Sequence, residues 1–194
     1  MQTGIPVARM ELLDDVQMGA CISYSKLEGY EEKPTIFFEF HGTETGAKEQ
    51  AEAVQAIAEE FGGSAFQWTS KMEDRNKLWQ ARHDAYYAAI ALRSGCQGWA
   101  TDVCVPVSRL AECINETKDD LEETGLISPL VGHVGDGNFH MLYIVDPNNQ
   151  EEMAKAQAHS DRMVMRALEM GGTCTGEHGV GYGKIHFLTN EHGD

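Results

Sequence analysis

The chain of 194 residues is long enough for one substantial hydrophobic core, and its composition, 42% hydrophobic and 24% charged, is that of a globular protein. Its 31 acidic residues against 15 lysines and arginines give a formal net charge of −16, which repels phosphate backbones and argues against nucleic acid as a partner. A site for an anionic substrate must therefore be built from identifiable cations or a metal ion.

The sequence also argues against a membrane segment and against disulfides. No apolar run approaches the roughly 20 residues that a membrane-spanning helix needs. The N-terminal MQTGIPVARMELLDD lacks the charged-then-apolar order of a signal peptide. Five cysteines without a CxxC pair are typical of reduced thiols in an intracellular protein. Composition alone therefore predicts a cytoplasmic protein without a transmembrane segment.

Hydrophobic periodicity predicts the elements of the first half of the chain: a strand at 6–14 running into a short helix, a strand at 34–40, a helix at 46–63, a strand at 64–70 and a long helix at 71–93. In the second half it predicts a strand at 99–107, a helix at 108–125 with a serine cap, paired strands at 128–134 and 138–145, and a helix at 149–170. This alternation indicates an α+β domain with one mostly antiparallel sheet and helices on one face.

Both ends of the chain indicate a piece of a longer protein. The sequence begins with an apolar β-type run and stops at TNEHGD without a closing helix. We therefore expect further chain outside residues 1–194.

The stretch VGHVGDGNFH, residues 131–140, carries two histidines around a glycine-rich turn. Asp-Gly between β-type runs is a strong signal for a two-residue hairpin loop. With Asp136 and Gly137 at the tip, His133 and His140 lie directly opposite each other on one face, with Cβ atoms about 5 Å apart. Two imidazoles at that distance can bind one ion. The alternative is an ordinary hairpin that carries two half-buried histidines.

A second glycine-rich stretch, GGTCTGEHGVGYGK at 171–184, supplies Glu177 and His178. Two histidines and a carboxylate suit Zn²⁺, Mn²⁺ or Fe²⁺ and leave coordination positions open. Cys174 is a rival ligand. If Glu177 faces the ion, we expect His178 to face the bound substrate and to act as a general base, because its unperturbed pKa lies near neutrality. The alternative is that His178 only supports the metal ligands.

Arg82 lies on an apolar stripe of the 71–93 helix, together with Leu78, Ala85 and Ala89. A cation in such a place needs an anionic partner. An arginine binds a carboxylate through two parallel hydrogen bonds, so a carboxylate ligand fits, and an ion pair with one of the chain's own acids is the alternative. Lys184 either adds positive charge to the same site or lies at the surface.

These motifs, together with LWQARHDAYYAA and TDVCVP, closely resemble the C-terminal domain of FAD-linked oxidases over nearly the whole chain. Within this family the sequence is most similar to mitochondrial-type, cytochrome-linked D-lactate dehydrogenases. Glycolate oxidases and D-2-hydroxyglutarate dehydrogenases are related. The resemblance implies a ferredoxin-like sheet and the oxidation of a D-2-hydroxy acid, with D-lactate giving pyruvate and reduced flavin.

The resemblance also assigns roles to individual residues. His133, His140 and Glu177 match the ligands of a divalent metal, zinc or manganese, and His178 matches the catalytic base. Asn138 matches a polar residue near the substrate, and Arg82 matches the arginine that pairs with the substrate carboxylate. It further implies a mitochondrial location and an electron acceptor such as cytochrome c or another redox carrier.

The sequence departs from the family at several places. Several relatives carry a lysine two residues before the aspartate of the DVxVP strand, where this chain has Ala100, which disfavours larger diacid substrates. The N-terminal FAD-binding domain and the final C-terminal helix are missing from 1–194. We therefore expect FAD to be held mainly by another domain, through residues that this chain does not identify, and the isolated fragment to be inactive.

Three alternatives remain open from the sequence. The first is a sibling dehydrogenase that acts on glycolate or D-2-hydroxyglutarate. The second is a metal-binding module that performs no chemistry. The third is a stand-alone metallohydrolase that uses the same centre of two histidines and one glutamate.

Overall fold

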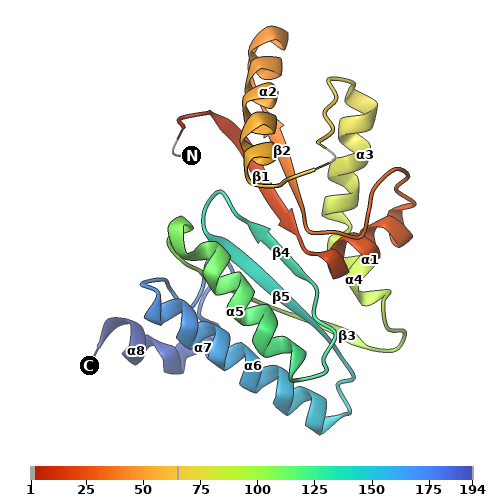
Figure 1. The fold of residues 1–194 in the computed structure, drawn as a ribbon. Helices are drawn as coiled ribbons and strands as arrows, with labels where there is room; N and C mark the ends of the chain where they lie inside the picture. The colour runs from red at the N-terminus through yellow and green to blue at the C-terminus, as the bar shows by residue number, and fades with distance from the viewer. Residues whose placement is uncertain (1–2, 65, 194) are drawn as a thin grey trace.

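The computed structural model describes residues 3–64 and 66–193, which form one five-stranded sheet with helices on both faces (Figure 1). The strands are β1 (Val7–Leu13), β2 (Thr35–Phe40), β3 (Gln97–Cys104), β4 (Leu130–His133) and β5 (Asn138–Val145). The helices are α1 (Asp15–Ser25), α2 (Glu44–Glu60), α3 (Met72–His83), α4 (Ala85–Ile90), α5 (Leu110–Glu122), α6 (Gln150–Glu169), α7 (Gly181–Lys184) and α8 (Leu188–His192), with 3₁₀ turns at Val107–Arg109 and Ile185–Phe187.

The strand order is β2-β1-β4-β5-β3, and every neighbouring pair is antiparallel. Because β5 is hydrogen-bonded between β3 and β4, the segment β3-α5-β4-β5-α6 is a split β-α-β unit of the ferredoxin-like kind. After α6 the chain returns to the outer side of β3 through one bridge between Cys104 and Thr173. The predicted α+β class with an antiparallel sheet is therefore confirmed.

Strand β5 is buried along its whole length because helices cover both of its faces. Its alternate residues point to opposite sides of the sheet. Met141 and Tyr143 pack in the main core with α5 and α6, whereas Leu142 and Ile144 pack with Ala89 of α4. The expectation of helices on one face is therefore too narrow.

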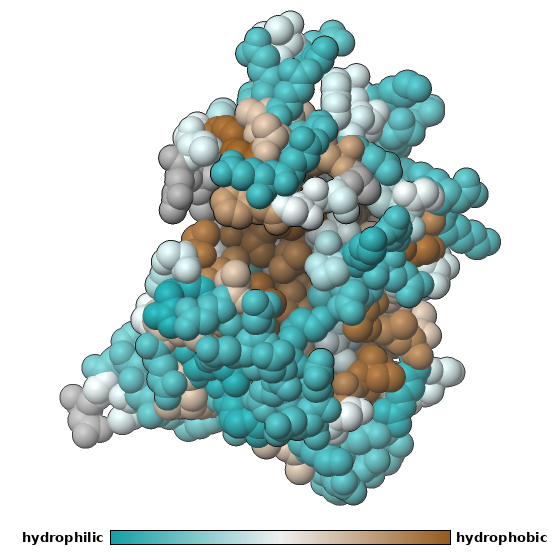
Figure 2. Space-filling view, viewed as in Figure 1, coloured by the Kyte–Doolittle hydropathy of each residue, from teal (hydrophilic) through white to brown (hydrophobic). Residues whose placement is uncertain are grey.

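Strands β1 and β2 have a more open face on the side of α5 and α6. Figure 2 shows apolar surface between α2, which lies over β2, and α5. Ile36 of β2 remains 45% exposed, and the rings of Phe38 and Phe40 stack 6.1 Å apart.

Most predicted elements are present, with two errors and one extension. The predicted strand at 64–70 is wrong for residues 66–70, which form no strand, and Ala65 lies outside the described residues. The predicted 71–93 helix divides at Asp84 into α3 and α4, in keeping with the preference of aspartate for helix termini. The short helix expected after β1 is the 11-residue α1, which Asp14 caps by accepting a hydrogen bond from the Gln17 amide at 2.8 Å.

The serine cap expected for the 108–125 helix is also wrong. Ser108 lies inside the 3₁₀ turn that precedes α5, and α5 begins at Leu110 without a side-chain cap. The cap of α6, by contrast, is Asn149, whose Oδ1 accepts from the amides of Glu151 and Glu152.

Candidate metal and substrate site

The two hairpin histidines lie on the sheet face opposite α5 and α6, where β4 ends and β5 begins. The predicted register is wrong: His133 pairs with Asn138, and His140 pairs with Val131. The error amounts to two residues, which is one full period of a strand, so His133 and His140 still share a face. Their ring centroids are 5.4 Å apart. The predicted pairing fails, but the predicted proximity is confirmed.

The loop between β4 and β5 has four residues instead of the predicted two because it is tied to the end of β3. The Gly137 carbonyl accepts a hydrogen bond from the Val105 amide at 3.0 Å, and the Cys104 thiol donates to the Asp136 carbonyl at 3.3 Å. Gly137 has φ +84°, and a Cβ there would lie 2.0 Å from the Val105 carbonyl oxygen. The glycine therefore allows a close approach between this loop and β3.

Asp102 holds the turn that carries Glu177 and His178. It lies on β3 opposite His140 and is fully buried. Its Oδ2 accepts hydrogen bonds from three successive amides, those of Gly176 at 2.6 Å, Glu177 at 2.7 Å and His178 at 3.2 Å. One carboxylate therefore fixes the backbone of both candidate functional residues to the sheet.

The charge of Asp102 is balanced by Lys184, whose ammonium donates to Asp102 Oδ1 at 3.0 Å, to the Asp102 carbonyl and to the Cys174 carbonyl. Burial alone would raise the Asp102 pKa, but the hydrogen bond from the Glu177 amide and the contact with Lys184 outweigh it and hold this pKa well below its usual range. Sequence reasoning missed Asp102. The available signal was an acid in the apolar run WATDVCVPV, because such an acid needs several partners.

Gly176 lets this turn lie directly on Asn138. A Cβ at residue 176 would be 1.7 Å from Asn138 Nδ2, closer than any side chain tolerates. Asn138 Nδ2 donates to the Val103 carbonyl at 3.0 Å, which leaves its buried Oδ1 without a partner among the described residues. Asn138, a predicted substrate contact, thus lies beside the turn and retains a free acceptor.

The three predicted metal ligands converge. His133 Nε2 lies 3.3 Å and His140 Nε2 lies 3.1 Å from the same carboxylate oxygen, Oε1 of Glu177. Atoms bound to one tetrahedral zinc ion at about 2.0–2.2 Å lie roughly 3.3–3.6 Å apart, so these separations fit a shared ion. In the described part of the chain, one atom from each of the three residues falls within 4.8 Å of the others. Cys174, the rival ligand, is buried elsewhere, with its amide bonded to Glu191.

The two histidines differ in their electrostatic environments. Burial, followed by the neighbouring charge of His178, lowers the pKa of His140 to about 4, so its ring is neutral at neutral pH, as a metal ligand requires. The hydrogen bond to Glu11 raises the pKa of His133, against a smaller opposing effect of burial. His140 Nδ1 is buried and has no hydrogen-bond partner within the described residues.

Glu11 connects Arg82 to the metal-ligand group, and the sequence did not identify Glu11 as part of the site. Arg82 donates to Glu11 Oε2 from Nε at 3.2 Å and from Nη2 at 2.9 Å. Glu11 Oε1 lies 2.8 Å from His133 Nδ1. The alternative that Arg82 pairs with one of the chain's own acids is therefore observed, and this pair is continuous with the metal-ligand group.

His178 lies against the ligand group instead of facing away from it. Its ring stacks on His140 with centroids 4.9 Å apart, and its Nε2 is 3.6 Å from Glu177 Oε1. The side chain is 47% exposed, so it is accessible to a small molecule. Together with Asp102 and His140 it forms the second group of closely spaced potential ligands in the described residues.

Lys184 and Ala100, the other two positions that the sequence singled out, also lie near the site. All three donors of Lys184 are engaged by protein atoms, so a substrate contact would require one of these bonds to be replaced. Ala100 is exposed and lies two residues before Asp102 on the same face of β3, where a lysine would add charge beside the site.

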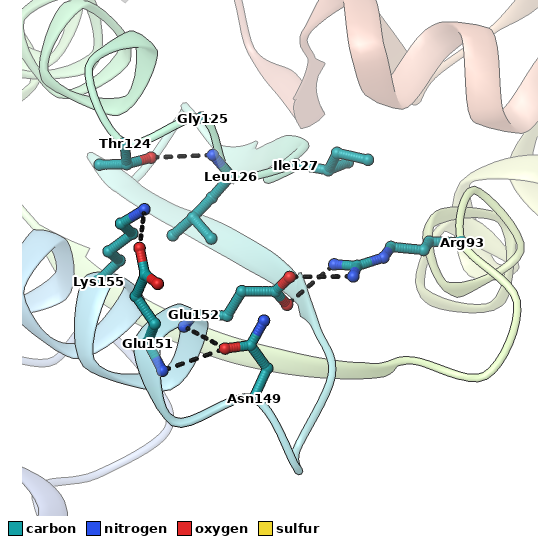
Figure 3. Close-up of a pocket in the computed structure, with 9 residues that line it drawn as sticks. All are labelled: Arg93, Thr124, Gly125, Leu126, Ile127, Asn149, Glu151, Glu152 and Lys155. Carbon is teal, nitrogen blue, oxygen red and sulfur yellow. Dashed lines mark hydrogen bonds and ion pairs between the residues drawn. The ribbon is translucent and has the colours of Figure 1, made fainter.

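A hollow at the opposite end of β4 and β5 does not contain these residues. Figure 3 shows its lining, in which Arg93 points to Glu152 and Lys155 points to Glu151. Arg93 makes two hydrogen bonds of 2.9 Å to Glu152, and Lys155 lies 2.8 Å from Glu151. Its charges are satisfied by each other, so the histidine end is the better candidate site.

Comparison with known proteins identifies the family of this chain. The family described as FAD linked oxidases, C-terminal domain, matches residues 1–194. The chain belongs to this family. It is 49% identical over its whole length to a probable mitochondrial D-lactate dehydrogenase of Danio rerio, of which it covers 39%. It is 44% identical to a mitochondrial D-lactate dehydrogenase [cytochrome] of Arabidopsis thaliana, again over all of this chain and 34% of that protein.

Solved structures with low sequence identity share the fold. A 4-ethylphenol oxidase from Gulosibacter chungangensis in complex with isoeugenol aligns with a TM-score of 0.59 at 12% identity, covering 84% of this chain and 38% of the other. An alkyldihydroxyacetonephosphate synthase aligns with a TM-score of 0.54 at 13% identity, covering 92% of this chain and 37% of the other.

The chain thus spans between about a third and two fifths of the length of the two D-lactate dehydrogenases. Within the described residues, no helix combines the length and the apolar character needed to cross a bilayer.

Proposed function

We propose that this chain is the substrate-binding and catalytic part of an FAD-dependent D-2-hydroxy acid dehydrogenase that oxidises D-lactate to pyruvate. The observation that carries the proposal is the convergence of His133 and His140 on Glu177, with His178 stacked beside them at an exposed position. Identities of 44–49% to D-lactate dehydrogenases support the choice of reaction.

In this proposal His133, His140 and Glu177 hold a divalent metal, zinc or manganese. A bound divalent ion supplies positive charge that lowers the pKa of a coordinated hydroxyl group. The donor set fits such an ion because two imidazoles and one carboxylate meet at spacings typical of shared coordination. The positive charge of the ion would also offset the repulsion between an anionic substrate and a protein of net charge −16.

His178 is proposed to accept the substrate hydroxyl proton at Nε2. That atom lies at the ligand group, 3.6 Å from Glu177 Oε1, and half of its side chain faces solvent. Its backbone amide is fixed by Asp102, so the imidazole is attached to a stationary part of the turn. A positioned base of this kind contributes typically about 10²–10⁴-fold to a rate.

Arg82 is proposed to bind the substrate carboxylate, and Asn138 to contact the substrate through its free Oδ1. The Arg82 side chain is only 16% exposed. Its Nε and Nη2 donate to Glu11, which leaves Nη1 for the substrate carboxylate. Lys184 is proposed to act from a distance, because its charge lies beside Asp102 and its donors are occupied. Together these residues orient a small 2-hydroxy acid between a cation and a base.

In this proposal FAD, when bound, would supply the electron-accepting chemistry of the reaction. We propose that it is held mainly by a domain outside residues 1–194, so that the isolated fragment neither binds FAD firmly nor turns over. The physiological acceptor beyond flavin is proposed to be cytochrome c or another redox carrier, and the location is proposed to be mitochondrial, as in the named relatives.

Sibling reactions on glycolate or D-2-hydroxyglutarate form the second candidate. The position of Ala100 disfavours the diacid, because this exposed place on the site face carries no cation. The test is dye reduction by the complete protein with D-lactate, D-2-hydroxybutyrate, glycolate and D-2-hydroxyglutarate. We expect the highest kcat/KM for D-lactate, and a preference for the diacid would contradict the proposal.

The role of His178 is tested separately. His178→Ala should abolish dye reduction and leave the metal content, measured by atomic emission, unchanged. Loss of the metal in this variant would mean that His178 is a ligand and that the base has been misassigned. A wild-type protein that holds metal but oxidises none of the four acids would favour the non-catalytic metal-binding module.

A further inference from the structure

Glu11 lies between the metal-ligand group and the proposed substrate arginine. It is on β1, only 6% exposed, and each of its two carboxylate oxygens serves a different partner. Oε1 lies 2.8 Å from His133 Nδ1, and Oε2 accepts both hydrogen bonds from Arg82. No other acid in the described residues is hydrogen-bonded to His133 and Arg82 together.

We propose that Glu11 is a positioning residue: it fixes His133 in the form that binds a metal and couples that ligand to Arg82. A carboxylate that accepts a hydrogen bond from Nδ1–H leaves the Nε2 lone pair free, and it also sets the orientation of the ring. In this structure His133 Nε2 does point to Glu177 Oε1, at 3.3 Å. The metal part of this inference needs only the three-residue ligand group, whereas the coupling to substrate rests on the proposed function.

Glu11 is negatively charged in this position. Its Oε2 accepts two hydrogen bonds from the guanidinium of Arg82, which is always charged, and this contact favours the ionised carboxylate. The ionised form accepts on both oxygens and donates on neither. Both neighbours are therefore held as donors, which gives His133 the required tautomer and gives Arg82 a fixed orientation.

A glutamine at this position cannot reproduce the arrangement. Its amide has one acceptor atom, and its NH₂ group only donates. If the oxygen faces His133, the NH₂ group meets the Arg82 donors. If the oxygen faces Arg82, the NH₂ group donates to His133 Nδ1 and the proton moves to Nε2, where it blocks the metal. Either orientation loses one of the two functions.

The experiment measures Mn²⁺ and Zn²⁺ affinity and D-lactate kinetics for the complete protein and its Glu11→Gln variant. We expect the variant to bind metal about 10- to 100-fold more weakly, in line with other outer carboxylates of metal-bound histidines. We also expect a higher KM for D-lactate at saturating metal. A folded Glu11→Gln protein with wild-type metal affinity would overturn the proposal.

Glu152→Gln is the matched control. Glu152 is also a partly buried partner of an arginine, Arg93, with two hydrogen bonds of 2.9 Å, but it contacts no histidine. We expect its metal affinity and KM to equal those of the wild type. An equal loss of metal affinity in both variants would mean that removing any such ion pair loosens the fold, which would also overturn a specific role for Glu11.

A measurement on the wild-type protein covers the case in which Glu11→Gln does not fold. Nitrogen-15 NMR of the neutral His133 ring, in the metal-free protein at alkaline pH, should find the proton on Nδ1. A proton on Nε2 would overturn the proposal, as would a wild-type protein that binds neither metal. A wild-type protein that binds metal but oxidises no hydroxy acid would refute the proposed function, while the metal affinities would still decide the role of Glu11.

Discussion

The two ends of strands β4 and β5 both carry an arginine paired with a glutamate, but the pairs differ in kind. At the hollow, Arg93 and Glu152 make two parallel bonds that use both carboxylate oxygens (Figure 3). At the histidine end, Arg82 uses only one oxygen of Glu11, and the other oxygen serves His133. The first pair is joined by the Asp146 amide, which donates to Glu152 Oε2 at 2.9 Å, whereas the second is connected to the candidate metal ligands.

Buried polar atoms without partners in the described part of the chain occur near both ends, and Ser128 Oγ, next to Ile127 of the hollow, is one of them. His140 Nδ1 and Asn138 Oδ1 are buried near the histidine end and lack partners among the residues described. A buried polar atom without a partner costs free energy, so its persistence usually has a functional reason. Incomplete bonding therefore does not separate the two ends, whereas converging potential metal ligands are found, within the described residues, only at the histidine end.

The largest expected effect comes from Asp102→Asn. The variant keeps the size of the side chain but removes the charge opposite Lys184 and weakens the hold on three amides. Breaking a buried pair by neutralising one partner typically costs about 3–5 kcal/mol. Urea unfolding should detect this loss of unfolding free energy, together with a loss of metal affinity. A stable variant that retains its metal would show that the turn is held by other contacts.

Gly176→Ala should have the next largest effect. The added methyl group would meet Asn138 Nδ2, so the turn must move away from β5. Inserting a methyl group into a packed region typically costs about 1–3 kcal/mol. We expect weaker Mn²⁺ binding in an isothermal titration, because Glu177 moves with the turn. Gly183→Ala is the control, since a Cβ there meets no atom within 4 Å, and equal effects of both changes would contradict this account.

His159 provides a buried histidine with both nitrogens bonded, in contrast to His140. Nδ1 accepts from the Tyr143 hydroxyl at 2.7 Å and Nε2 donates to the Thr117 carbonyl at 3.0 Å. Burial lowers the pKa of His159 from its ordinary value of 6.5, so below pH 6.5 the unfolded state binds the proton more readily. The unfolding free energy should therefore fall as the pH drops below about 6.5, by up to about 1.4 kcal/mol for each unit by which the native pKa is lowered.

Urea unfolding at pH 7.5 and 5.5 measures this dependence. His159→Gln should show a smaller decrease in unfolding free energy between the two pH values than the wild type. His41→Gln, which changes a side chain that is 75% exposed, should show the wild-type decrease. Identical decreases in all three proteins would assign the acid sensitivity to other groups.

Glu152→Gln should have a smaller effect than Asp102→Asn, Gly176→Ala or His159→Gln. The pair with Arg93 is partly open to solvent, and pairs of this kind contribute little to stability. A small shift of the urea midpoint is expected, with no change in metal affinity or kcat/KM. A loss of activity comparable to that of Asp102→Asn would remove the distinction between the two ends of the sheet.

Much of the fold was predictable because periodicity reports burial directly. Strand β5 and helix α6 are long and strongly patterned, and both were predicted within one residue at each end. The predicted strand at 64–70 failed where residues 66–70 form no strand, because a short run with aromatic residues resembles a strand without neighbours to pair with. The break at Asp84 was missed because the apolar stripe continues across it, although aspartate is a residue type that favours helix termini.

The sequence predicted the residues of the candidate site better than it predicted the contacts between them. His133, His140 and Glu177 are recognisable as residue types beside glycine-rich turns, and their convergence is confirmed. The register between β4 and β5 was not predictable, because the loop is fixed by contacts with Val105 and Cys104 from another strand. Glu11 lies 71 residues from Arg82 and 122 from His133 in the chain, and only the folded sheet brings them together.

The anchoring of the 175–178 turn by Asp102 also bears on how the proposed metal site would exchange its ion. In zinc fingers the ion itself supplies the folding free energy, so losing the ion means unfolding. Here three amides are tied to a carboxylate of the sheet, and no ion takes part in those bonds. In the proposed site, exchange of one divalent ion for another would need only the departure of three ligand atoms, and the scaffold would stay folded throughout.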